Sequence, residues 1–286
     1  MNYPDKIDLH LHTVISDGSD TPEELLEKIR EQGIQMYSIT DHDAVLGCEK
    51  TRTILQEGDP LFIPGVEFSC RDEFGKYHIL GYGYDPEAEP VRRIVETGHR
   101  YRMEKVKGRL KILREKEGIV FSDDEIRKLL ALNNPGKPHI GILMVRHGFA
   151  DTIARAIWII DQLHYRGSYV RPGEAIRGIL ESGGIPVLAH PVFGSGSEII
   201  TGEEMDERLR YLIGYGLQGV EAFYSRYSEE MVGEMLMYAE KYELYVTAGS
   251  DYHGVNKQVR LGQTRWDPAM GIPEGMRRFF DAVLKQ

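Results

Sequence analysis

Short apolar runs alternate with helical patterns along most of the chain. The apolar runs predict seven strands, at residues 7–11, 35–39, 61–68, 77–83, 185–189, 219–223 and 244–248. Between the first two strands, Thr21 and Glu24 form a capping box around Pro22, and Gly33 is suited to end the helix that follows. Strands that alternate with helices are typical of parallel β/α units. The pattern therefore predicts an α/β fold.

The regular spacing breaks in the middle of the chain. Between residues 84 and 185 no convincing strand is predicted, and this gap is far longer than the ~30 residues of one β/α unit. Most of the gap has helical periodicity, including a second capping box from Ser122 to Glu125. We interpret residues 98–172 as a helical insert that caps the cleft, and residues 1–97 and 173–286 as a barrel that carries the site.

Composition narrows the classes of function. The chain has 286 residues, of which 41% are hydrophobic and 28% charged, as in an ordinary soluble protein. No apolar run approaches the ~18 residues of a membrane span, and the first residues lack the apolar region of a secretory signal. We expect a cytoplasmic protein with reduced Cys48 and Cys70 and no membrane partner. The formal charge of −10 disfavours binding of nucleic acid through the overall charge of the protein, but it allows a local basic cleft.

Histidines and carboxylates recur in or just after the predicted strands. His10 and His12 share one face of the first strand, about 7 Å apart, although an H-x-H pair alone also fits an exposed polar strand face. The further members of the set are Asp17, His42, Glu67, His78, His190, Asp251 and His253. Because β/α barrels draw their site residues from the carboxyl ends of several strands, these side chains predict one common site.

The chemistry of this set points to metal ions. Nitrogen and oxygen ligands suit Mn, Fe or Zn better than metals that thiolates select. The set is too large for one ion and, with bridging carboxylates, fits two or three divalent ions. Clustered ions suit phosphoester hydrolysis because they activate water and neutralise phosphate charge. They would also provide the positive potential that an acidic protein needs to bind an anionic substrate.

The motifs resemble those of the PHP (polymerase and histidinol phosphatase) family of phosphoesterases. The matching segments, in family order, are D-L-H-L-H-T, S-D-G, T-P-E-E-L, I-T-D-H-D, G-V-E-F-S, H-I-L-G, A-H-P and S-D-Y-H-G. The resemblance implies a distorted (β/α)7 barrel and two or three bound metals. The sites would be formed by His10, His12, Glu67 and Asp251; by Glu67, His78 and His190; and by Asp17, His42 and His253. It gives Glu221 no ligand role, and Asp43 either supports His42 or is an exposed polar residue.

The insert resembles that of a nucleotide-processing branch of the family. The segments K-P-H-I and R-G-S-Y-V-R-P carry this likeness. It implies hydrolysis of nucleotide phosphomonoesters, of the AMP or 3′,5′-nucleoside bisphosphate type, or of short 5′-phosphorylated RNA, by a metal-activated hydroxide. Lys137, His139 and Arg171 would contact the substrate, and His139 or His253 would protonate the leaving oxygen. Lys137 stands where the branch usually has Arg, and Lys cannot form a bidentate fork with phosphate.

Several alternatives stay open at this point. The chain fits, less well, a histidinol-phosphate phosphatase or a non-catalytic metal-binding interaction module. We expect a small phosphorylated substrate and no obligate protein partner. The basic stretch 92–116 fits a solvated helix face or a guide for an RNA backbone. Tyr224, Tyr227 and Trp158 are suited to stack on a base or to pack in the protein.

Overall fold

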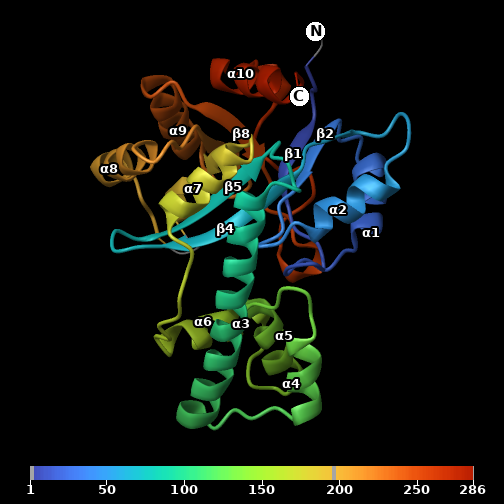
Figure 1. The fold of residues 1–286 in the computed structure, drawn as a ribbon, viewed down its shortest axis with the longest axis vertical. Helices are drawn as coiled ribbons and strands as arrows, with labels where there is room; N and C mark the ends of the chain where they lie inside the picture. The colour runs from blue at the N-terminus through green and yellow to red at the C-terminus, as the bar shows by residue number, and fades with distance from the viewer. Residues whose placement is uncertain (1–2, 195–197, 286) are drawn as a thin grey trace.

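A computed structural model describes residues 3–194 and 198–285 and has a mixed α/β fold (Figure 1). The first sheet is parallel, with strand order β1-β2-β3. Its strands and their connecting helices are β1 (Ile7–Leu11), α1 (Pro22–Glu31), β2 (Met36–Ile39), α2 (Leu46–Ile54) and β3 (Leu61–Phe62). The predicted capping box of Thr21 and Glu24 forms, so α1 begins at Pro22 as expected.

The second sheet has strand order β4-β5-β6-β7-β8. Its strands are β4 (Gly65–Arg71), β5 (Lys76–Tyr82), β6 (Ile185–Leu188), β7 (Gly219–Tyr224) and β8 (Tyr245–Gly249). The helices of this part are α7 (Pro172–Glu181), α8 (Gly202–Ile213), α9 (Glu229–Lys241) and α10 (Glu274–Val283). Helix α7 packs on β5 and β6, α9 on β7 and α10 on β8, and these contacts enclose the main apolar core.

The strands depart from the predicted parallel arrangement in two ways. The predicted strand 61–68 is split into β3 and β4 at Pro64, which has no N–H to give to a ladder. Strand β5 is antiparallel to both β4 and β6. The few residues between β4 and β5 are enough for a hairpin, whereas a parallel crossover needs a dozen or more.

The two sheets meet without a continuous ladder. Isolated bridges join Leu11 to Tyr252 and His42 to Glu67, so the edges of the two sheets lie side by side at the carboxyl ends of β1 and β2. Over the described ranges the sheets are open, and no closed barrel of hydrogen-bonded strands is present. The predicted mixed α/β class is confirmed, whereas the closed ladder of a barrel is not observed.

One long helix joins the sheets to a helical lobe. Helix α3 (Glu89–Glu117) packs against α7 near its start, and its second half lies among α4 (Asp123–Leu130), α5 (Lys137–Arg146) and α6 (Ile153–Gln162) (Figure 1). This lobe has its own apolar cluster, drawn from residues between Val106 and Leu163. Because α3 is continuous from residue 89, no break in secondary structure marks the boundary predicted at residue 98. In the described part of the chain, no helix is long and apolar enough to cross a membrane.

Candidate metal centre and active-site cavity

The predicted ligands come together at the carboxyl ends of the strands, where the backbone is locally strained. His190 follows β6 with φ of 29°, and Asp251 follows β8 with φ of 59°. Positive φ is uncommon for non-glycine residues and is concentrated at functional sites. Gly249 allows the close approach of β8 to β1, because a Cβ there would lie 2.3 Å from Cβ of His10.

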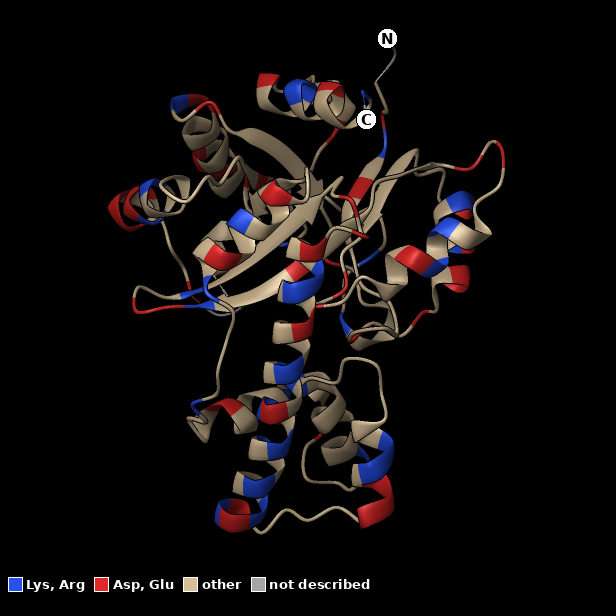
Figure 2. Cartoon of the chain, in the orientation of Figure 1, with Lys and Arg blue, Asp and Glu red and all other residues tan. Residues whose placement is uncertain are grey.

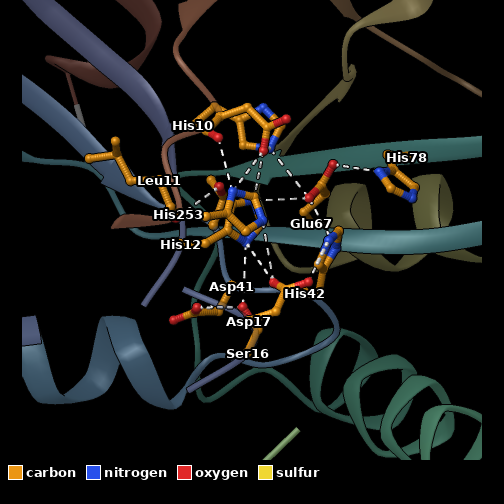
Figure 3. A network of polar contacts seen from close by, with 12 residues as sticks. His10, Leu11, His12, Ser16, Asp17, Asp41, His42, Glu67, His78 and His253 are labelled. Carbon is orange, nitrogen blue, oxygen red and sulfur yellow. Dashed lines mark hydrogen bonds and ion pairs between the residues drawn. The ribbon is translucent and has the colours of Figure 1, made fainter. Parts of the chain in front are cut away.

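The carboxylate of Glu67, on β4, lies at the centre of the cluster (Figure 3). Its Oε2 atom is 3.3 Å from Nε2 of His10, 3.2 Å from Nε2 of His12 and 3.0 Å from Nδ1 of His42. One carboxylate oxygen therefore faces three imidazoles, which are carried by β1 and by the segments that follow β1 and β2.

The second oxygen of Glu67 faces a different pair of histidines. Its Oε1 atom is 2.8 Å from Nδ1 of His78, on β5, and 3.2 Å from Nε2 of His190. His78 and His190 are themselves 3.3 Å apart at these nitrogens. Burial lowers the pKa of His78 to about 4, so this imidazole is neutral and able to ligate at neutral pH.

Asp17 and Asp251 complete the cluster on its other side. Asp17 lies 3.4 Å from Nε2 of His253 and 3.8 Å from both His12 and His42. Asp251 lies 3.5 Å from Nε2 of His12 and 3.7 Å from Nε2 of His10, and it also pairs with Lys257. All of the predicted ligands are thus brought into one site.

The donor atoms fit metal ions better than they fit one another. Three groups of ligand atoms lie mutually within 4.8 Å: those of His12, Asp17, His42 and His253; of His10, His12 and Glu67; and of His42, Glu67 and His78. Among the described residues, buried Nε2 of His10, Nε2 of His12 and Oε2 of Glu67 have no hydrogen-bond partner. Buried polar atoms without partners are costly, and coordination to a cation would satisfy them.

Electrostatics keep the carboxylates in their ligating, charged form. Burial alone would raise the pKa of Glu67, but the histidines around it hold that pKa well below its usual range. In the same way, His42 and His253 overcome the effect of burial and hold the pKa of Asp17 well below its ordinary value. Burial and neighbouring His253 lower the pKa of His12 far below its usual range. Burial would lower the pKa of His10, but the carboxylates of Glu221 and Glu67 hold it well above its usual range, and Glu67 and Asp17 also raise the pKa of His42 against the effect of burial. Binding of a divalent cation by these two imidazoles would therefore release protons.

A fully buried carboxylate behind the cluster was assigned no role from the sequence. Oε1 of Glu221, on β7, is 2.9 Å from Nδ1 of His10, and its Oε2 accepts a hydrogen bond from the backbone N–H of His190. A carboxylate on Nδ1 favours the tautomer that turns Nε2 of His10 toward Glu67. The position of Glu221 in a strand was a usable signal, but its partners could not be read from spacing.

Asp41 and Asp43 also support the cluster from behind. Asp41 accepts hydrogen bonds from the backbone and hydroxyl of Thr13 and from the hydroxyl of Ser16, which fixes the loop that carries Asp17. Asp43 is buried and accepts a bond from the backbone N–H of Ser69, so it is a supporting residue rather than an exposed one.

A cavity of about 630 Å³ opens over the cluster. One wall carries the candidate ligands, and the opposite wall comes from the helical lobe. The lobe contributes basic side chains of α3, including Arg102 and Lys105, and an apolar patch of α6 with Ile153 and Ile157. The cavity therefore offers an anion-binding region and an apolar surface beside a metal-type site.

The predicted substrate contacts are not all brought to this cavity. Lys137 lines it, although its Nζ is 2.9 Å from Asp161. His139 is half-buried at the start of α5, where its Nδ1 accepts a hydrogen bond from the N–H of Gly136, and it is not among the residues that line the cavity. Arg171 is exposed and pairs with Glu73 at 2.7 Å, outside the cavity lining.

The predicted aromatic contacts are also divided. Tyr224 lines the cavity, and its hydroxyl donates a hydrogen bond to Asp251. Tyr227 is buried in the core, where its hydroxyl accepts a hydrogen bond from the backbone N–H of Val192. Trp158 is half exposed on α6 and stacks with Arg155.

Comparison with known proteins identifies the family. A family model for the PHP domain matches residues 8–170, more than half of the chain. The chain belongs to the PHP domain family. This match covers most of the candidate ligands, and the resemblance based on motifs is confirmed.

Curated relatives of this PHP protein are hydrolases of phosphate esters. A phosphoribosyl 1,2-cyclic phosphate 1,2-diphosphodiesterase of Eggerthella lenta is 28% identical over 86% of this chain and 94% of its own. The 5′-3′ exoribonuclease Rnm of Salmonella typhimurium is 28% identical over 94% and 92%. A 3′,5′-nucleoside bisphosphate phosphatase of Chromobacterium violaceum is 26% identical over 93% and 94%.

A solved structure has the same overall arrangement. It is a candidate metal-dependent phosphoesterase from Bifidobacterium adolescentis, which superposes with a TM-score of 0.83, 25% identity and 98% coverage of both chains. Together with the family match, these likenesses confirm the predicted class of enzyme, a metal-dependent phosphoesterase.

Proposed function

We propose that this PHP protein hydrolyses phosphomonoesters of nucleotides, with 3′,5′-nucleoside bisphosphates, AMP and short 5′-phosphorylated RNA as its substrate class. The observation that carries the proposal is the cavity, which sets a metal-type cluster against a wall with both basic and apolar side chains. The metal-type cluster and the basic side chains suit a phosphate, and the apolar side chains suit a nucleobase. Relatives that are a bisphosphate phosphatase and an exoribonuclease add support.

We assign the cluster to two or three divalent ions of Mn, Fe or Zn. His10, His12, Glu67 and Asp251 would hold one ion; Glu67, His78 and His190 a second; and Asp17, His42 and His253 a third. When bound, such ions activate water for attack on phosphorus and neutralise the charge of the phosphate. Glu221 would keep His10 in the ligating tautomer, since the carboxylate is 2.9 Å from Nδ1.

Two histidines are our candidates for proton transfer. Because Nδ1 of His139 accepts a hydrogen bond from Gly136, the neutral ring carries its proton on Nε2 and can donate a hydrogen bond from there to a leaving oxygen. His253 lines the cavity, with its Nε2 3.4 Å from Asp17 and its Nδ1 2.9 Å from the backbone carbonyl oxygen of Asp251. Lys137 would bind a phosphate oxygen as a point charge. Arg171 stays a predicted substrate contact that would first have to leave Glu73.

The finer architecture is also part of this proposal. The isolated bridges at Leu11 and at His42 set the two sheets edge to edge, in keeping with a distorted (β/α)7 barrel whose ladder is interrupted. Residues 98–172 would form the insert that caps the cleft, and the basic and apolar wall of the cavity supports that function.

A substrate panel tests the proposal. Phosphate release would be compared, at saturating Mn²⁺, for adenosine 3′,5′-bisphosphate, AMP, a 5′-phosphorylated dinucleotide, histidinol phosphate and a ribose 1,2-cyclic phosphate. We expect the highest kcat/KM for one of the three nucleotide substrates. Preference for histidinol phosphate or for the cyclic sugar phosphate would contradict the substrate class while leaving the phosphoesterase itself intact.

A further inference from the structure

The buried stripe of α3 changes character halfway along the helix. Its buried positions recur with helical spacing, first as apolar Val91 and Ile94 and later as apolar Leu113. Between them, the buried positions are Gly98 and apolar Val106 together with Arg102, Lys105 and Arg109, and each of these three cations is less than a tenth exposed. A stripe that should be apolar is therefore cationic where it faces the cavity. Figure 2 shows how densely Lys and Arg recur along this helix.

Two of these three cations form no ion pair with any residue that the structure describes. Arg102 lies 3.3 Å from Asp43 and 3.7 Å from Asp17. Across residues 3–194 and 198–285, by contrast, neither Lys105 nor Arg109 has a carboxylate oxygen within the 4.0 Å of an ion pair. A buried charge without a partner is costly, so a position of this kind is retained where a ligand of opposite charge binds.

The surroundings hold Lys105 in place rather than letting it reach solvent. Its Nζ lies 3.6 Å from the centre of the Tyr169 ring, a cation–π contact. The backbone of Gly167 packs on its stem, since a Cβ there would lie 2.5 Å from Cγ of Lys105. Burial lowers the pKa of Lys105 to about 7 and also lowers the pKa of Arg109, as expected for cations that lack an anion.

The position of the pair relative to the metal centre follows from helix geometry. Arg102 touches Asp17 of the cluster, and at 1.5 Å per residue Lys105 and Arg109 lie about 4.5 and 10 Å further along the axis. All three line the same cavity as the candidate ligands. A substrate whose reacting phosphate sits at the cluster would therefore present its next phosphate to Lys105 and Arg109.

We propose that Lys105 and Arg109, with Tyr169 beside them, form a second phosphate subsite that selects substrates carrying a further phosphate beyond the one that is hydrolysed. The proposal rests on the proposed phosphoesterase function of the same cavity. The shared ligand chemistry is a phosphate monoester or diester, and its source is either the other phosphate of a nucleoside bisphosphate or the first internucleotide phosphate of a short RNA. Arg109 is suited to a bidentate contact, whereas Lys105 supplies a point charge.

The test is the double variant Lys105→Met/Arg109→Met, which keeps side-chain length and removes both charges. Its readout is the ratio of kcat/KM for adenosine 3′,5′-bisphosphate to that for AMP. With roughly tenfold expected from each charge-assisted contact, the ratio should fall by about 10- to 100-fold, mainly through KM. A 5′-phosphorylated dinucleotide, compared with AMP in the same way, distinguishes the RNA source of the phosphate from the bisphosphate source.

Two further variants control the test. Lys107→Met removes a charge from the exposed face of the same helix and should leave the ratio and the activity unchanged. Arg109→Lys retains a cation and should lower the ratio by no more than about threefold. If the folded double variant keeps the wild-type ratio within twofold for both two-phosphate substrates, the subsite is refuted.

A binding measurement separates this inference from the proposed function. If the wild-type protein hydrolyses no nucleotide, calorimetric titration with adenosine 3′,5′-bisphosphate and with AMP still tests the subsite. Tighter binding of the bisphosphate, lost in the double variant and kept in Lys107→Met, supports the subsite on its own. Equal affinity for the two nucleotides refutes it.

Discussion

The two walls of the cavity oppose each other in charge and in origin. The sheet wall gathers histidines and carboxylates from the ends of many strands, and its buried donor atoms lack partners that a cation would supply. The lobe wall gathers cations from one face of a single helix, and two of them lack partners that an anion would supply. The difference shows that each wall lacks a partner of a different charge: the sheet wall lacks a cation, and the lobe wall lacks an anion. A metal-bound phosphate ester between them would complete both.

The largest effect should come from removing the centre of the sheet wall. Glu67→Gln takes away a charge that faces five histidines, so we expect loss of at least one bound metal ion and a drop in kcat/KM of about a thousandfold or more. Metal content by mass spectrometry and phosphate release would be measured together. The exposed Glu57→Gln is the matched control. A Glu67→Gln protein with full metal content and activity would contradict the assignment of Glu67 as the central ligand of the sheet wall.

An intermediate effect should come from the carboxylate behind the cluster. Glu221→Gln leaves every candidate ligand in place but weakens the orientation of His10, so metal affinity should fall about 10- to 100-fold. Activity should return at high metal concentration, which a lost ligand would not allow. Metal titrations of activity would measure both quantities. A loss of activity that no metal concentration restores would show that Glu221 acts directly in the site.

A packing defect in the lobe should lower the stability of the protein without changing metal binding at the sheet wall. Leu113 is fully buried in the apolar cluster of the lobe, so Leu113→Ala should lower the free energy of unfolding by about 2–5 kcal/mol. Because the ligands lie in the sheet part, metal binding by the folded variant should stay within about twofold of wild type. Denaturant unfolding and metal titration test the two statements. Coupled loss of metal affinity would show that the lobe helps to shape the metal centre.

The smallest effect should come from the exposed arginine. Arg171→Ala removes a surface ion pair with Glu73, and such pairs contribute little, so kcat/KM should change by less than about threefold. Lys137→Ala, on the cavity lining, should cost about tenfold. Steady-state kinetics on one nucleotide would compare the two. A rise in KM of tenfold or more in Arg171→Ala would show instead that Arg171 leaves Glu73 and contacts the substrate.

The sequence predicted the sheet wall well because its signals are local. Each ligand lies in or just after a strand, and strand ends of this kind converge. The positions of His10, Glu67 and Asp251 could thus be predicted without knowledge of how the strands pair. The way the strands pair could not be predicted, because Pro64 divides one predicted strand and the short β4–β5 connection makes β5 antiparallel to β4.

The lobe wall was harder to predict because its signals depend on contacts between distant segments. Basic residues along 92–116 looked like a solvated helix face, and only the register of α3 against the cavity reveals that Lys105 and Arg109 are buried. Arg171 stays a predicted substrate contact, but its ion-pair partner Glu73, which is 98 residues away in sequence, could not be predicted. Spacing along the chain carries no information on such pairs.

The most direct test of the central claim is metal-dependent hydrolysis of a nucleotide phosphomonoester. Protein stripped of metal would be titrated with Mn²⁺ while phosphate release from adenosine 3′,5′-bisphosphate is followed. The account predicts no release without metal, and activity that rises to a plateau as two or three equivalents bind. Release that is independent of metal, or full metal binding with no hydrolysis of any nucleotide, would contradict it.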